Sequence, residues 1–187
     1  MTRHPVRSVA AAGLCVLALT VGIGVIGFAA PIVPEARRLD DQARSLVRIK
    51  RLRLAVDKLP VEIQNVGVRG EEIRDRWVTR LTQVGIEVTD DERDPTLRLY
   101  LSAVTESKVP KAVAFNPFLS LEQPARIDGI DNPLIVPTYL HILVGLETED
   151  TLADSVNVTV EGMLDRFIKL RDAAIVTARN EAAAQTP

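Results

Sequence analysis

Few residues of this chain have the type and spacing that chemistry requires, and the densest group is acidic. Residues 90–94 hold four carboxylates, those of Asp90, Asp91, Glu92 and Asp94. Such oxygens are the ligands that Ca²⁺ prefers, but the glycine and the distal glutamate of an EF-hand loop are absent. The turn at 128–132 offers only two carboxylates. We therefore expect both segments to be turns, and we predict no metal site, no cofactor and no catalytic residue.

Nucleophilic chemistry has equally little support. The two histidines, His4 and His141, stand alone, without the neighbours that a catalytic triad or a zinc site would supply. A hydrolase whose residues meet only in the fold is the alternative, and it would need a cleft uniting His141 with a serine and a carboxylate. Cys15 is the only cysteine, so no intramolecular disulfide can form and cysteine usage does not identify the compartment.

Four basic residues gather at 48–53, namely Arg48, Lys50, Arg51 and Arg53. Such a cluster could bind an anionic membrane surface, and the alternative is a solvated strand face balanced by acidic residues elsewhere. Without Arg3 and Arg7 the chain has 21 Lys and Arg against 25 Asp and Glu, a net charge of −4. No aromatic residue is interleaved with the cluster, and we expect no nucleic-acid partner.

An uncharged apolar segment, Val9 to Ala30, follows a short basic start. As a helix it would be about 33 Å long, enough to cross a bilayer core of about 30 Å. Two interpretations stay open. We expect an uncleaved membrane anchor, and the alternative is a signal peptide removed after Ala29. Although Arg37, Arg38 and Arg44 follow the segment, long domains are exported largely regardless of such charges. We therefore expect a bacterial inner-membrane protein with a periplasmic domain, or a periplasmic protein if cleavage occurs.

The most regular pattern in the chain lies between Arg69 and Val104. Ile73, Trp77, Leu81 and Val84 recur every three to four residues, which predicts a helix with one apolar stripe. Gly85 follows where a left-handed helix cap favours glycine. Segments 86–89 and 97–104 then alternate as half-buried strands do. A first strand at 48–56 and this crossover predict a helix lying across one face of a sheet.

Prolines interrupt the next segment, from Val109 to Pro137. Because proline donates no backbone hydrogen bond, we expect strands here to lie at an under-paired sheet edge. Such an edge can bind a strand of another chain. Phe115, Phe118 and Leu121 would then contact the partner, unless they complete this domain's own core. Segment 138–146 is the candidate for a central strand, and 154–179 for a long helix.

The sequence as a whole predicts an α+β fold, with four or five mostly antiparallel strands and two helices on one face. The predicted divisions are a signal or anchor at 1–30, a juxtamembrane linker or helix at 31–46, one domain at 47–180 and a disordered tail at 181–187. The order of elements, with Gly85-Ile86-Glu87-Val88 ending the first long helix and Leu164-Asp165-Arg166-Phe167 in the last, resembles small periplasmic modules of bacterial envelope proteins, of the curli-secretion and Tol-system type. The resemblance implies a non-catalytic role in binding or assembly, with another envelope protein as partner.

Overall fold

The computed structural model describes residues 40–105, 111–126 and 128–185. These residues fold around a six-stranded sheet. The strands are β1 (Arg51–Val56), β2 (Glu87–Thr89), β3 (Thr96–Thr105), β4 (Ala112–Ala125), β5 (Leu134–Ile142) and β6 (Gly145–Thr148). The helices of the described residues are α1 (Asp41–Leu46), α2 (Val61–Asn65), α3 (Gly70–Gln83) and α4 (Glu149–Ala184).

The sheet has the order β2-β1-β3-β4-β5, with β6 also beside β4. Strand β1 is parallel to both β2 and β3, and the remaining pairs are antiparallel. Parallel neighbours need a crossover, and the segment containing α3 supplies it between β1 and β2. The predicted α+β class is confirmed, whereas the sheet has one strand more than expected and is mixed.

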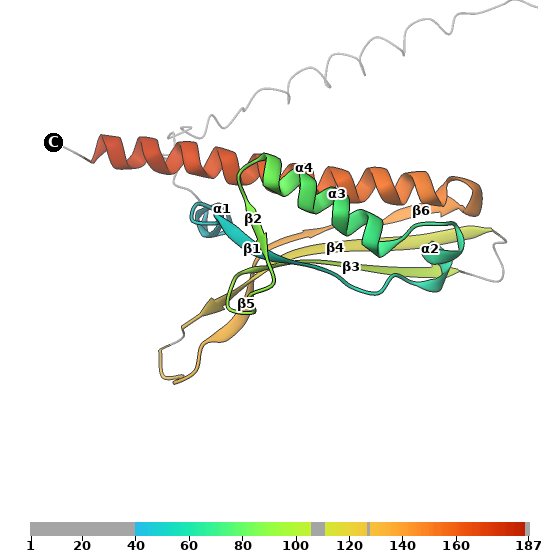
Figure 1. The fold of residues 1–187 in the computed structure, drawn as a ribbon, viewed down its shortest axis with the longest axis horizontal. Coiled ribbons are helices and arrows are strands. Elements are labelled where there is room, and N and C mark those ends of the chain that lie inside the picture. Colours follow the sequence, from blue (N-terminus) through green and yellow to red (C-terminus); the bar gives the residue numbers. More distant parts are fainter. Residues whose placement is uncertain (1–39, 106–110, 127, 186–187) are drawn as a thin grey trace, which may run out of the picture. The chain divides into compact units, whose positions relative to one another are not determined.

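Helices α3 and α4 cover the same face of this sheet (Figure 1). Side chains alternate accordingly along β3, where Leu97, Leu99 and Leu101 are buried while Arg98 and Tyr100 face the other side. Strand β4 alternates in the same way. The sheet therefore has an inner face, which forms the core with the helices, and an outer face that no helix of the described residues covers.

The predicted stripe of α3 is confirmed, because Ile73, Trp77 and Leu81 are each fully buried. Gly85 has a φ of 75° and ends the helix in the left-handed conformation that glycine adopts at little cost. Helix α4 supplies nine more buried side chains, which are Leu152, Val156, Val160, Met163, Leu164, Phe167, Ile168, Arg171 and Ala174. The guanidinium of Arg171 is retained in this core because its Nε donates to the carbonyl of Ile49, 2.9 Å away.

Several boundaries differ from the sequence prediction. Helix α1 packs against β5 and α4 and buries Leu46, so the folded part begins before residue 47. Helix α4 continues through Ala184, past the expected end of the domain. The connection before α3 contains α2, where Ile63 is buried. Segment 138–146 was expected to be central and instead lies in β5 and β6, at the edge of the sheet.

The apolar segment Val9 to Ala30 and Cys15 lie outside the described residues. In the part of the chain that is described, no helix is both long and apolar enough to cross a bilayer.

Trp77 gives a direct test of the packing of α3. Trp77→Ala should lower the free energy of unfolding by about 3 to 5 kcal/mol, because a fully buried indole leaves a cavity. Trp77→Phe should cost less, since the buried indole Nε1 has no hydrogen-bond partner among the described residues. Chemical denaturation followed by circular dichroism measures both. A loss below about 1 kcal/mol for the alanine variant would contradict burial.

Gly145 tests the packing that positions β6. The ring of Phe115 lies directly against Gly145, where it occupies the space of a β-carbon. Gly145→Ala should therefore cost about 1 to 3 kcal/mol of unfolding free energy through overpacking. Combining it with Phe115→Leu, which vacates that space, should cost less than the sum of the two single changes. Strict additivity in this double-mutant cycle would show that the ring does not set the position of β6.

Candidate binding surface

Strands β5 and β6 together form one long edge of the sheet. Both pair with β4 in a single register, since Ile142 lies opposite Phe118 and Gly145 lies opposite Phe115. Between them Leu143 donates its backbone N–H to the carbonyl of Pro117, at 3.1 Å. Pro117 has no N–H to return a bond, so the ladder is interrupted there although the strand direction continues.

The backbone of this edge points alternately toward β4 and away from it. The carbonyl of Leu140 points away, because it accepts a bond from the side chain of Gln42 in α1, at 3.3 Å. The N–H of Leu143 points toward β4. Alternation then directs the backbone groups of Ile142, Val144 and Leu146 outward. Within the described residues, no segment supplies hydrogen bonds to these outward groups.

Exposed apolar side chains accompany this unpaired backbone. Ile142, Val144 and Leu146 are 46%, 77% and 71% exposed and lie on the outer face of the sheet. The patch continues from the edge toward the centre of the outer face, because Tyr100, Phe118 and Ile142 lie side by side on three neighbouring strands. We call this patch the open face, and it consists of Tyr100, Val104, Phe118, Leu140, Ile142, Val144 and Leu146. Contiguous apolar surface of this kind is typical of interaction sites.

The predicted edge residues are not at the edge. Strand β4 pairs with β3 on one side and with β5 and β6 on the other, so an edge at Phe115, Phe118 and Leu121 is wrong. Phe115 and Leu121 lie in the core at 3% and 0% exposure. Phe118 belongs to the open face instead. Whether any of the three contacts a partner stays a prediction.

The prolines explain this difference. Pro117 lies at the interruption between β5 and β6, and Pro124 lies beyond Glu122, where β4 no longer pairs with β3. Each proline therefore lies where the ladder is incomplete, as the missing N–H requires. Strand β4 itself is central, because most of its fourteen residues lie between β3 on one side and β5 or β6 on the other. Among the described prolines of this segment, Pro137 alone lies in an edge strand, β5, as expected.

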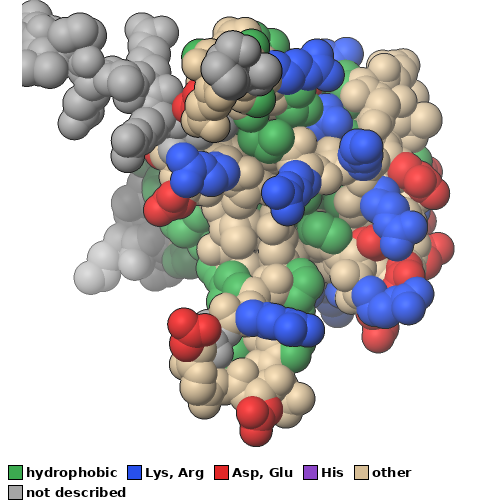
Figure 2. Space-filling view, turned by 90° about the vertical axis from the view of Figure 1, so that its left-hand side faces the viewer, with side chains coloured by type: hydrophobic (Ala, Val, Ile, Leu, Met, Phe, Trp, Pro, Cys, Tyr) green, Lys and Arg blue, Asp and Glu red, His purple; other side chains and the backbone are tan. Residues whose placement is uncertain are grey.

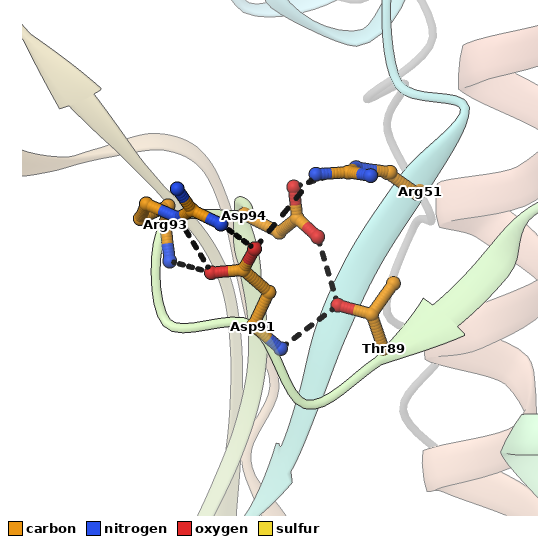
Figure 3. A network of polar contacts seen from close by, with 5 residues as sticks. All are labelled: Arg51, Thr89, Asp91, Arg93 and Asp94. Carbon is orange, nitrogen blue, oxygen red and sulfur yellow. Dashed lines mark hydrogen bonds and ion pairs between the residues drawn. The ribbon is translucent and has the colours of Figure 1, made fainter.

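The acidic turn at 90–94 binds arginines (Figure 3). Asp94 is 8% exposed and accepts bonds from Arg51 Nε and from the hydroxyl of Thr89, each at 2.8 Å. Arg93 donates to Asp91 through its guanidinium and its backbone and so holds the pKa of that carboxyl well below its usual range. Three of the four carboxylates of the turn therefore pair with arginines, Asp90 with Arg74, Asp91 with Arg93 and Asp94 with Arg51. No group of three potential metal ligands occurs among the described residues.

Half of the basic cluster is engaged by neighbouring side chains. Arg51 pairs with Asp94, and Arg53 donates from Nε to the hydroxyl of Thr96 at 3.2 Å. Arg48 and Lys50 lie exposed in the connection between α1 and β1. Contact of these four basic residues with an anionic surface stays a prediction. Arg51 and Arg53 already bond to side chains of this domain.

A groove of about 790 Å³ runs between the β5 edge and α4 on the inner side. Its apolar wall includes Leu143 and Val158, and Arg166 and Lys169 stand beside it. In Figure 2, which faces the end of the molecule where α4 ends, several Lys and Arg side chains stand singly on the surface, and those at the right lie beside Asp and Glu side chains. No local pattern signals this groove, because its residues come from two separate segments, 141–143 and 158–173.

His141 lies in this groove without a catalytic partner. Its Nδ1 is buried and has no hydrogen-bond partner among the described residues, and burial, aided by the charge of Arg166, lowers its pKa. The groove also contains Asp165, which accepts a bond from Arg80 at 3.3 Å, but no serine lines it. The arrangement that the hydrolase alternative requires is not found here.

Comparisons with known proteins give distant likenesses. No protein-family model matches the chain, and no curated protein matches it. Among solved structures, a minor lipoprotein from Acinetobacter baumannii is 16% identical with a TM-score of 0.30, covering 74% of this chain and 97% of its own. Rare lipoprotein B from Shewanella oneidensis is 15% identical with a TM-score of 0.27, covering 72% and 97%.

An uncharacterized lipoprotein B from Nitrosomonas europaea is 11% identical with a TM-score of 0.24, covering 75% of this chain and 92% of its own. Similarity at this level assigns neither a family nor a function to this chain. The resemblance to curli-secretion and Tol-system modules accordingly stays an expectation.

Proposed function

We propose that this protein is a non-catalytic binding module of the bacterial cell envelope, which captures an extended segment of another envelope protein. The observation that supports the proposal is the outward-directed backbone of Ile142, Val144 and Leu146 beside the open face. A strand added there gains backbone hydrogen bonds from the edge and apolar contacts from the face. An exposed edge of this kind is otherwise a liability, because it pairs with any available strand.

The envelope location is supported by the sequence alone. The uncharged segment Val9 to Ala30 has the length of a membrane helix and follows a short basic start. We propose that it tethers the domain to the inner membrane with the open face outside the cytoplasm. Cleavage of the segment would give a periplasmic protein with the same binding surface.

The membrane-surface alternative, which uses Arg48, Lys50, Arg51 and Arg53, has less support. Binding of anionic lipid gains about 1 kcal/mol for each cation near the surface, and that gain requires a cation without a competing partner. Arg51 has such a partner in Asp94, at 2.8 Å. The two exposed cations, Arg48 and Lys50, have only the buried Ile49 between them and form a weaker surface than the open face.

Strand addition can be tested by proline substitution. Val144→Pro removes an outward N–H without removing a bond to β4, so it should reduce partner capture by about tenfold or more while leaving the circular dichroism unchanged. Val61→Pro is the matched control, because Val61 is 61% exposed and begins α2, a position that tolerates proline. Crosslinking in membranes followed by copurification measures capture. Equal capture by both variants would place the binding surface elsewhere.

The tether can be tested by fractionation. The full chain should sediment with membranes and resist extraction by high salt, since a span of about 20 apolar residues inserts stably. Amino-terminal sequencing should begin near Met1. A mature protein that begins at Ala30 in a soluble fraction would exclude the anchor and support the signal peptide.

A further inference from the structure

The groove between β5 and α4 indicates which chemical groups an added strand would carry. It lies immediately beside the unpaired edge, because His141 and Leu143 belong to both. A strand that pairs with Ile142 and Val144 would alternate its own side chains between the open face and the vicinity of this groove. The groove can therefore recognise groups of the added strand.

The charges beside the groove are unbalanced. Arg76 and Arg80 of α3 engage the acidic residues of α4, at 2.9 Å to Glu161 and at 3.3 Å to Asp165. Arg166 and Lys169 line the groove from the same helix, and neither has an ion-pair partner among the described residues. The occupant that complements this wall is an anion attached to an apolar chain.

Helix α1 determines where an added strand must end. The side chain of Gln42 bonds to the outward carbonyl of Leu140, and α1 also contacts α4. A strand running antiparallel to β5 and β6 would pass Leu146 first and reach α1 last. Its carboxyl end would then lie at the end of the unpaired edge, next to the groove that contains Arg166 and Lys169.

We propose that the occupant is the carboxyl-terminal segment of a partner protein, added antiparallel to β5 and β6, with its terminal carboxylate bound by Arg166 and Lys169. The last apolar side chain of that segment packs against Leu143 and Val158 in the groove. This proposal rests on the proposed strand addition and specifies its direction and its chemistry. Terminal-carboxylate capture beside a strand edge uses charge-assisted hydrogen bonds, which are stronger than neutral ones.

The test uses the full chain in detergent and a random heptapeptide library displayed with free carboxyl ends. A selected peptide is resynthesised as the carboxylate and as the amide, and binding is followed by fluorescence anisotropy. The amide should bind at least about tenfold more weakly, because charged hydrogen bonds are lost. The double variant Arg166→Gln with Lys169→Gln should weaken the carboxylate by a similar factor and leave the amide unchanged. Arg179→Gln, an exposed cation of α4 that does not line the groove, is the matched control.

The outcomes separate the two proposals. If Val144→Pro weakens the peptide while amidation has no effect, strand addition stands and carboxylate capture is wrong. If amidation matters and Val144→Pro does not, the peptide binds in the groove without joining the sheet, and both the strand addition and this inference are wrong. In a third outcome, the library yields no binder, while the wild type still captures partners and Val144→Pro abolishes that capture. This result overturns carboxylate capture alone.

A small amphiphile is the competing occupant. Dodecanoate is added to the wild type, to the double variant and to Val144→Pro in the same assay. Tight binding that depends on Arg166 and Lys169 but not on Val144, with no peptide selected, would identify an acyl-carboxylate groove and overturn the peptide proposal. Competition by dodecanoate only at concentrations far above the peptide's dissociation constant supports the peptide.

Discussion

The contact of α3 and α4 with a single face of the sheet is the interaction on which the remaining structure depends. The helices bury the leucines of β3 and β4 together with Trp77 and Phe167. Removal of this apolar surface from water is the dominant favourable term in folding. Because the helices cover one face only, the core requires nothing of the outer face. Apolar residues there, such as Val104 and Leu146, are consequently available for contacts with other molecules.

Local patterns were sufficient to predict most of the elements. The spacing of Ile73, Trp77 and Leu81 identified α3, and alternation identified β1 and β3, because each pattern reflects the burial of one face. The order of strands was less accessible. Segment 138–146 is as apolar as a central strand, yet it lies at the edge of the sheet. Its apolar character comes partly from the side chains of the open face, which are exposed. The hydropathy of a segment does not distinguish burial inside its own domain from a surface that binds another molecule.

The candidate site was only partly predictable for a related reason. Prolines indicated that a strand edge lies between Val109 and Pro137, and the reasoning from the missing N–H was sound. It could not distinguish an edge strand from a central strand whose ladder has two gaps, at Pro117 and Pro124. The groove has no local sequence pattern, because Arg166 and Lys169 of α4 form a site only together with Leu143, which the fold brings from the connection between β5 and β6.

Helix α1 occupies one end of the edge that we propose for binding. Its six residues hold the carbonyls of Thr138 and Leu140 through Ser45 and Gln42, with donor–acceptor distances of 3.4 and 3.3 Å. Displacement of so short a helix would release both carbonyls and lengthen the edge available to a partner. The same helix begins at Asp41, at the start of the described domain. Because Leu46 of α1 is fully buried, the length of the edge that we propose for recognition depends on the packing of six residues that precede the first strand.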